Sequence, residues 1–300
     1  MQATSDPRPV VVAVDTSESA RDAAAWAADL AADWSAPLHL LHVELGDPTD
    51  APLPAQPWLL ELESVAERAG ATDRRVEVRP GDVIQVVSAR AFDARLIVLG
   101  SYGDGAWSGM LAGSVALGVL GRARCPVAVV RGSAPRIAPP RGGPVVVGVD
   151  GSAASVAALE VAADLAASLG ARLVAVEAWS DVAVGPGGTP FRRREAPDEL
   201  FAEAAAELEA SLLPLRERYP DLAVDQVVAE GTPVRVLLDR AAGARMLVVG
   251  TRGRTGYTGM LMGSTSNALV EFAPCPVVVV HGTGAAGGRE TPGTRAGVRS

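Results

Sequence analysis

Two glycine-rich stretches of this chain share one spacing and contain the residues best suited to bind an anion. They are "VLGSYGDGAWSGMLAGS", residues 98–114, and "VVGTRGRTGYTGMLMGS", residues 248–264. The shared positions are Gly100, Gly103, Gly113 and Ser114 in the first stretch and Gly250, Gly253, Gly263 and Ser264 in the second. Glycine lets backbone amides approach phosphate oxygens closely, and a following helix adds unpaired N–H groups. The spacing therefore predicts a phosphate-binding loop that needs no lysine.

An ordinary glycine-rich turn is the alternative interpretation of each stretch. In that case Ser264 would only cap the helix that follows it. The occurrence of the same spacing twice favours phosphate binding. We include Thr265, the next residue of the expected helix, in the candidate site.

The two stretches differ in charge. The second carries Arg252 and Arg254, whose guanidinium groups could contact phosphates, although two solvated arginines on a surface loop would have the same sequence. The first has Tyr102 and Asp104 at these positions, and a carboxylate repels a triphosphate. The sequence predicts that the second half binds a phosphorylated ligand more tightly than the first.

An aspartate follows the first apolar run of each half and precedes a helix. The candidate residues here are Asp15 in the first half and Asp150, Gly151 and Ser152 in the second. The serines suit helix caps, and the aspartates could accept hydrogen bonds from ribose hydroxyls or bind Mg²⁺ through water. At the end of the second apolar run, the backbone of Val43 or of Ala178 could pair with an adenine ring, or could be an ordinary strand end.

The sequence of the first half recurs in the second. "PVVVAVDTSESA" at residue 9 matches "PVVVGVDGSAAS" at residue 144, and "CPVAVVRG" at residue 125 matches "CPVVVVHG" at residue 275. The offset between matching segments grows from 135 to 150 residues, so the second half contains a 15-residue insertion. We place this insertion at residues 180–197, whose Gly, Pro and Arg content predicts a mobile loop.

Short β-branched runs alternate with Ala-rich helical stretches in each half. In the first half we expect strands at 10–14, 38–43, 75–78, 96–99 and 127–130, and helices at 17–34, 58–69, 83–92 and 114–121. This alternation predicts two α/β domains with doubly wound parallel sheets, in which ligands bind where the strand order reverses. We expect domains at 9–132 and 144–282, a linker at 133–143, and disordered ends at 1–8 and 283–300.

Composition argues against several classes of protein. The formal charge of -8 and pI near 5.0 do not suit a nucleic-acid binder, and the absence of lysine excludes a Walker A loop and a Schiff-base lysine. The chain shows no signal-peptide pattern and no apolar run approaching about 18 residues, so we expect no membrane span. With only Cys125 and Cys275 as cysteines, we expect a cytoplasmic protein.

Taken together, these features resemble the universal stress protein family in tandem. The resemblance rests on the aspartate after the first strand, the "GDV" and "GTP" turns at residues 81 and 231, the glycine spacing and the closing "CPVAVV" and "CPVVVV" runs. It implies Rossmann-like domains, similar to adenine nucleotide alpha hydrolases, with five parallel strands each and paired through their last strands as an internal pseudo-dimer. It also implies ATP, AMP or ADP, with or without Mg²⁺, in the cleft. The base would lie near Val43 or Ala178, the ribose near Asp15 or Asp150, and the phosphates on the glycine stretches.

From the residues and the resemblance we expect a nucleotide-binding regulatory protein of stress responses without efficient catalysis. The nucleotide should sit mainly in the second domain, and slow hydrolysis would rest on Asp150 and an arginine alone. A protein partner and a homodimer are compatible with this interpretation. The alternative is a nucleotide-independent interaction scaffold, at least for the first domain.

Overall fold

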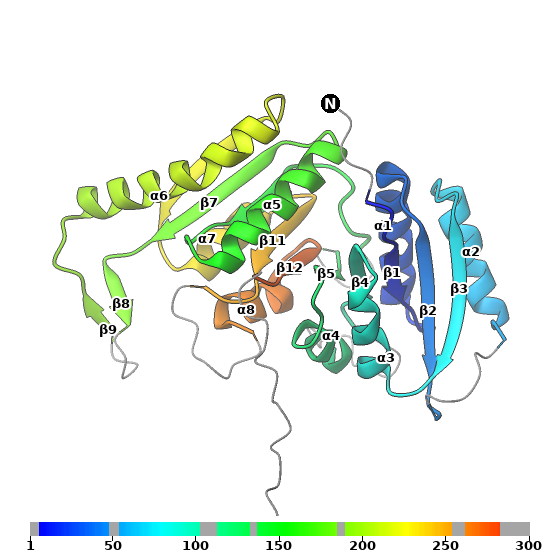
Figure 1. Ribbon diagram of the computed structural model, residues 1–300. Helices are drawn as coiled ribbons and strands as arrows, with labels where there is room; N and C mark the ends of the chain where they lie inside the picture. The colour runs from blue at the N-terminus through cyan, green and yellow to red at the C-terminus, as the bar shows by residue number, and fades with distance from the viewer. Residues whose placement is uncertain are drawn as a thin grey trace, which may run out of the picture.

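The computed structural model describes residues 6–47, 54–102, 113–132, 137–184, 190–253 and 262–282, and shows two halves with the same order of alternating elements (Figure 1). The first half contains β1 (Val10–Ala13), α1 (Glu18–Trp34), β2 (Leu38–Glu44), α2 (Pro57–Arg68), β3 (Arg74–Pro80), α3 (Val83–Ala89), a 3₁₀ turn (Arg90–Phe92), β4 (Leu96–Gly100), α4 (Ser114–Leu120) and β5 (Val127–Val130). The second contains β6 (Val145–Gly148), α5 (Ala153–Ser168), β7 (Leu173–Trp179), β8 (Val182–Val184), β9 (Pro190–Arg192), α6 (Pro197–Arg218), β10 (Val224–Glu230), α7 (Pro233–Ala241), β11 (Met246–Gly250), α8 (Ser264–Phe272) and β12 (Val277–Val280). The expected disordered tail, 283–300, and part of the expected linker lie outside the described residues.

Within the described residues, ten strands form one sheet in the order β10-β7-β6-β11-β12-β5-β4-β1-β2-β3. Each half contributes five parallel strands, and the halves meet where β5 and β12 run antiparallel with Ala128 opposite Val278. The predicted fold class is confirmed. The strands and helices expected in the first half agree with the structure to within two residues at each end, except that the helix expected at 83–92 is α3, which ends at Ala89, followed by the 3₁₀ turn. The agreement follows from strong signals, because continuous valine runs and alanine-rich helices alternate between clear turn residues.

Both faces of the sheet are apolar and covered by helices. Val10 and Val12 belong to the core beneath α1 and α2, whereas Val11 points to the opposite core beneath α3 and α4. All three side chains are buried, as expected for parallel strands with helices on both faces. The second half repeats this division, with α5 and α6 on one face and α7 and α8 on the other.

On the face covered by α1 and α5, the two halves meet at Trp34. Its indole N–H donates to Ser168 Oγ at 2.8 Å, and the Arg95 guanidinium lies 3.7 Å from the centroid of its ring. Stacking of a guanidinium on an indole favours this geometry and keeps the cation at a partly buried boundary. Trp34 therefore serves as a contact between domains.

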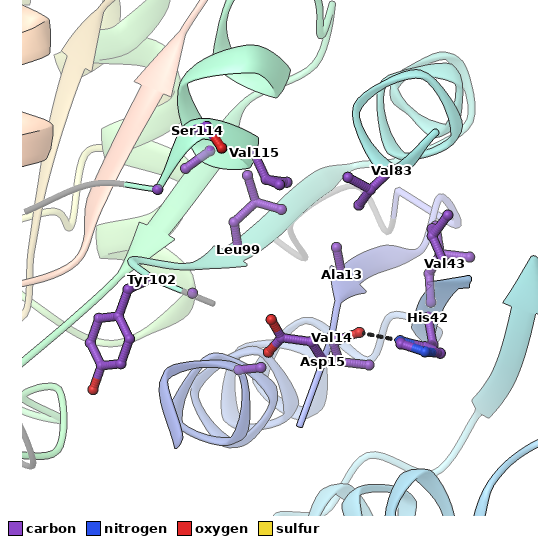
Figure 2. Close-up of a pocket in the computed structure, with 15 residues that line it drawn as sticks. Ala13, Val14, Asp15, His42, Val43, Val83, Leu99, Tyr102, Ser114 and Val115 are labelled. Atoms are coloured by element: carbon purple, nitrogen blue, oxygen red, sulfur yellow. Dashed lines mark hydrogen bonds between the residues drawn. The ribbon is translucent and has the colours of Figure 1, made fainter. Parts of the chain in front are cut away.

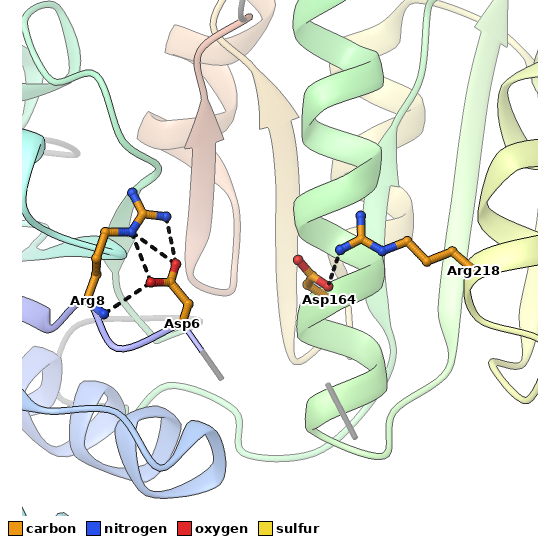
Figure 3. Close-up of polar contacts among 4 residues, drawn as sticks. All are labelled: Asp6, Arg8, Asp164 and Arg218. Atoms are coloured by element: carbon orange, nitrogen blue, oxygen red, sulfur yellow. Dashed lines mark hydrogen bonds and ion pairs between the residues drawn. The ribbon is translucent and has the colours of Figure 1, made fainter. Parts of the chain in front are cut away.

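Carboxylates balance the charge of Arg95 at this boundary. Burial lowers the pKa of Arg95, while the nearby charges of Asp6 and Asp164 act in the opposite direction. Asp6 is itself paired with Arg8 at 2.7 Å, and Asp164 with Arg218 at 3.8 Å (Figure 3). The boundary thus carries a network of alternating charges rather than a purely apolar contact.

On the opposite face, two equivalent residues reach across between the halves. Arg131 donates to the carbonyl oxygens of Val270 and Glu271 at the end of α8. His281, 150 positions later, places Nε2 3.0 Å from the carbonyl oxygen of Leu120 at the end of α4. A carbonyl only accepts, so Nε2 is the donor. Each side chain therefore satisfies orphan carbonyls of the other domain's helix.

The insertion in the second half is divided between a helix and a hairpin, which corrects the prediction of one mobile loop at 180–197. Helix α6 has 22 residues and α2 has 12, and both end at equivalent positions, Arg218 and Arg68. Ten inserted residues therefore lengthen the start of α6. The preceding segment contains β8 and β9, which pair antiparallel. Its valines and phenylalanine favour strand pairing despite the neighbouring glycines and prolines.

Gly250 ends β11 at a point where α5 packs directly on the sheet. A Cβ at this position would lie 2.7 Å from the backbone carbonyl carbon of Ala154. Its equivalent, Gly100, is similarly close to Ser19 of α1, at 2.9 Å from the carbonyl carbon. The first glycine of each predicted phosphate-binding stretch is therefore required by helix packing, whatever it contributes to a ligand.

Replacing Gly250 by alanine should destabilise the fold. We expect Gly250→Ala to lower the free energy of unfolding by about 1–3 kcal/mol, because the backbone of α5 must move away from the new methyl group. The matched control is Gly142→Ala, since a Cβ at Gly142 would meet no atom within 4 Å. Urea unfolding measures both variants, and equal stabilities would contradict the close approach of α5 to β11.

Cys125 and Cys275 stand just before β5 and β12, where both are buried free thiols. Burial raises the pKa of Cys125 to about 11 and that of Cys275 to about 12. Both thiols therefore stay protonated near neutral pH and pack as small apolar groups.

The folded protein should protect both cysteines from alkylation. With a pKa of about 12, the thiolate fraction of Cys275 at pH 8 is on the order of 10⁻⁴. We expect no iodoacetamide adduct by mass spectrometry on the native protein at pH 8 and two adducts after denaturation in guanidinium. Labelling of the native protein at the denatured rate would show that the junction of β5 and β12 opens readily.

Candidate functional site

Strand order reverses between β1 and β4 in the first half and between β6 and β11 in the second. Helices leave such neighbouring strands on opposite faces, so a crevice opens beyond their carboxyl ends. The structure has a cavity at each reversal: cavity 1, of about 430 Å³, in the first half and cavity 2, of about 550 Å³, in the second. Both volumes fall in the usual range for small-molecule sites.

The cavities bring together most of the residues predicted from sequence. The predicted residues that line cavity 2 are Asp150, Ala178, Gly250, Arg252, Gly253, Gly263, Ser264 and Thr265. Those that line cavity 1 are Asp15, Val43, Gly100, Gly113 and Ser114 (Figure 2). Gly151 and Ser152 form the turn from β6 into α5 and are not among the lining residues that the structure describes. Gly103, Asp104 and Arg254 lie outside the described residues.

Asp150 both shapes the start of α5 and faces cavity 2. Its Oδ1 accepts from the Ser152 N–H at 3.1 Å and from the Ser152 hydroxyl at 2.6 Å, and Ser152 Oγ accepts from the Ser155 N–H at 3.2 Å. Asp15 receives the same two bonds from Ser17. The two interpretations of these aspartates are compatible, since helix capping by the serine leaves the carboxylate in the cavity wall.

Two glycines of the second stretch, Gly253 and Gly263, have distinct structural roles. A Cβ on Gly253 would lie 2.4 Å from Asp150 Oδ2, so this glycine makes room for the carboxylate. The N–H of Gly263 donates to the Thr251 carbonyl oxygen at 2.7 Å, and Gly263 stands at the cap position of α8. The alternative in which Ser264 caps this helix is therefore wrong, because Ser264 is its first residue.

The first turn of α8 forms part of the wall of cavity 2. The amides of residues 264–266 have no acceptor within the helix, because the first residues of any helix lack a preceding turn. Ser264, Thr265 and Ser266 all line the cavity. The Ser266 hydroxyl donates to the Gly250 carbonyl oxygen at 2.6 Å, which ties the start of α8 to the end of β11.

Arg252 brings positive charge to the rim of cavity 2. Its side chain is exposed, and its carbonyl oxygen accepts from Ser152 Oγ at 3.3 Å, which anchors the backbone of this segment to the start of α5. Burial lowers the pKa of His281, and the charge of Arg252 lowers it further. The field of Arg252 therefore extends from the cavity rim towards the boundary between the halves.

Sequence reasoning missed several lining residues. Glu177, which is 3% exposed, lines cavity 2 next to Ala178, and His42 occupies the equivalent place in cavity 1. A charged residue inside the apolar run "LVAVEAW" was an available signal for Glu177. Leu237 of α7 offered no such signal, because its position in the wall depends on how α7 packs against the sheet.

No described helix combines the length and the apolar character needed to cross a membrane. In the same part of the chain, no group of three or more His, Cys, Asp or Glu side chains is arranged to hold a metal ion.

The fold and the two cavities define a tandem pair of doubly wound α/β domains with a ligand-sized cavity at each strand-order reversal. A sequence model of the universal stress protein family matches residues 7–131 and again residues 143–281. The chain therefore belongs to the universal stress protein family, as a tandem member.

Individual relatives agree with this assignment over nearly the whole chain. A universal stress protein of Mycobacterium tuberculosis is 35% identical over 291 residues, and one of Mycobacterium bovis is 38% identical over 293 residues. Each alignment covers 91% of this chain and 96% of the relative. The crystal structure of a universal stress protein from Archaeoglobus fulgidus shares the fold, with a TM-score of 0.64 at 21% identity over 92% of this chain and 98% of that one.

Proposed function

We propose that this chain is a regulatory protein of stress responses that binds ATP, AMP or ADP, mainly in cavity 2 and without efficient catalysis. The observation that carries the proposal is that Arg252, which follows β11, and the first turn of α8 line the same cavity. Membership of the universal stress protein family supports the role in stress.

The phosphate end of the proposed site is built from backbone and hydroxyl donors. Ser264, Thr265 and Ser266 line the cavity at the positive end of α8, a nine-residue helix, and their amides and hydroxyls are the proposed phosphate donors. Helix N-termini of this kind bind phosphate through unpaired N–H groups and the helix dipole. Arg252 adds a charge that could pair with phosphate oxygens.

The base would occupy the other end of cavity 2. Val176, Ala178 and Leu237 line it there with apolar surface, and the backbone at the end of β7 could pair with a ring edge. Strand β6 separates β7 from β11, so the two ends of the site are roughly 10 Å apart. That span suits a base and a phosphate group joined by ribose, with Asp150 between them to accept from ribose hydroxyls.

The two carboxylates of cavity 2 have different places relative to the phosphates. Asp150 stands beside the glycine stretch, close to Gly253. Glu177 lies on β7, two strands away from β11, so its charge acts mainly at the base end. Among the described residues that line cavity 2, Asp150 is therefore the carboxylate nearest the proposed phosphates, and the charge of Arg252 opposes its repulsion.

The residues of cavity 2 would hold Mg²⁺ only together with a bound nucleotide, whose phosphate oxygens would complete the coordination. Mg²⁺ binds one or two carboxylates together with waters and phosphate oxygens, and Asp150 is the carboxylate near the proposed phosphates. Asp150 would hold such an ion through water, and the ion would neutralise phosphate charge. Efficient hydrolysis is not expected, because Asp150 Oδ1 already accepts two bonds from Ser152 and a better-placed base is missing from the described wall of cavity 2.

Regulation would follow if the nucleotide bound one state of the protein better than another. Domains at 9–132 and 144–282, a cytoplasmic location for a chain with two free thiols, and further association into a homodimer belong to the same proposal. A nucleotide-independent interaction role for the first domain is the second candidate. It is favoured by Tyr102, which stands where the second domain has Arg252.

Calorimetric titration of the full chain tests the proposed site. We expect Arg252→Ala to weaken ATP binding roughly fivefold to tenfold at low salt, since exposure and screening reduce a charge-assisted hydrogen bond from its usual strength. Adenosine binding should be unchanged. Arg216→Ala, which removes an exposed arginine far along α6, is the matched control and should bind ATP like the parent.

Two outcomes would count against the proposal. One is a flat ATP titration of the parent chain together with no nucleotide found by mass spectrometry after gentle purification. The other is an ATP affinity that survives Ala178→Trp, which would fill cavity 2, but is lost with Val43→Trp, which would fill cavity 1. The second result would move the nucleotide to the first domain.

A further inference from the structure

Cavity 1 keeps the frame of cavity 2 but replaces its polar end with apolar groups. At equivalent positions Tyr102 stands for Arg252, while Val115 and Ala116 stand for Thr265 and Ser266. These residues all line their cavities. On the neighbouring helix, a third hydroxyl is absent from cavity 1, since Ala20 of α1 stands at the position of Ser155 of α5.

These replacements remove the cation and two of the hydroxyls that would assist a phosphate at this end, while Ser114 and the first turn of α4 remain. Among the described residues that line cavity 1, Asp15 is the only side chain with a formal charge at neutral pH when histidine is neutral, and that charge is negative. Helix α4 has seven residues, against nine in α8, and Val115 and Ala116 present methyl groups at its start. A phosphate entering here would lose hydration without gaining a cation or hydroxyl donors from these positions.

The remaining part of cavity 1 still suits a ring and a sugar. Asp15 retains the position and the serine contacts of Asp150, and Val43 retains the strand end equivalent to Ala178. Leu41, Val83 and Leu99 supply apolar walls. Figure 2 shows Asp15 at the end of β1 with Val83 and Val115 across the cavity from it.

His42 makes the ring end of cavity 1 different from that of cavity 2. It stands where cavity 2 has the carboxylate of Glu177, and its Nδ1 donates to the Val14 carbonyl oxygen at 2.8 Å (Figure 2). The rings of His42 and Trp58 pack in a T-shaped pair, with centroids 5.0 Å apart and planes at 89°. The ring end is therefore walled by a fixed aromatic group instead of a second carboxylate, which favours an uncharged flat ligand.

We propose that cavity 1 is a separate site for an uncharged purine nucleoside and selects against its phosphorylated forms. The proposal rests on the proposed function, because the base and ribose positions are taken over from cavity 2 by equivalence. One chain would then hold a nucleotide in its second domain and a nucleoside in its first.

Titration of adenosine into the ATP-saturated parent chain tests this selectivity without any mutation. We expect one equivalent of adenosine to bind while ATP occupies cavity 2, and Val43→Trp to abolish that binding. In the Ala178→Trp chain, where only cavity 1 is open, ATP should bind at least about tenfold more weakly than adenosine.

A graft of the polar end should reverse the preference. Adding Tyr102→Arg, Val115→Thr and Ala116→Ser to the Ala178→Trp chain should strengthen ATP binding by about tenfold or more and leave adenosine binding within about threefold. Ile137→Arg, which adds the same charge at an exposed position outside the cavity, is the control and should change neither affinity. If the triple variant misfolds, Tyr102→Arg alone should strengthen ATP binding by a smaller factor.

The inference is overturned if ATP-saturated parent chain binds no adenosine, or if the Ala178→Trp chain binds ATP as tightly as adenosine. These failures are distinct from failure of the proposed function, which is measured in the Val43→Trp chain. If the Val43→Trp chain fails to bind ATP, the proposed nucleotide site in cavity 2 is refuted. The selectivity of cavity 1 is still tested by comparing adenosine with ATP in the Ala178→Trp chain.

Discussion

The reversal of strand order beside β1 and β6 is the constraint on which both cavities depend. In each half the chain first runs from β1 or β6 to the edge of the sheet, and its right-handed crossovers place α1, α2, α5 and α6 on one face. It then returns to the other side of β1 or β6, and these crossovers place α3, α4, α7 and α8 on the opposite face. The helices that follow β6 and β11 therefore diverge, and a space remains beyond the two strand ends. Close packing of α5 on Gly250 sets how near these elements approach, and so sets the floor of cavity 2.

The junction of the halves connects this frame to the rest of the chain. Pairing of β5 with β12 hides an edge that each sheet would otherwise expose. Helix α8 begins at cavity 2 and ends against Arg131 of the first domain, while α4 begins at cavity 1 and ends against His281 of the second. Each proposed ligand site is thus linked to the other domain through a single short helix.

Duplication left the two cavities free to diverge in chemistry while their backbone frame stayed the same. The capping bonds of Asp15 and Asp150 are nearly identical, and so are the close approaches at Gly100 and Gly250. The side chains that would meet phosphate differ instead, with Arg252 in one cavity and Tyr102 in the other. The two halves therefore share the residues that hold the fold together, and they differ in the side chains that would face a ligand.

The sequence alone determined the tandem α/β fold, the helix and strand positions of the first half, and the strand ends at which most of the predicted site residues line a cavity. Those features follow from local patterns, namely continuous valine runs, alanine-rich helices and recurring glycine spacings. Only the tertiary structure decided that Gly250 is required by α5, that Gly263 rather than Ser264 caps α8, and that Glu177 and His42 enter the cavity walls. It also divided the insertion between α6 and a hairpin. These outcomes depend on contacts between segments far apart in the chain, and no local pattern of residues encodes such distances.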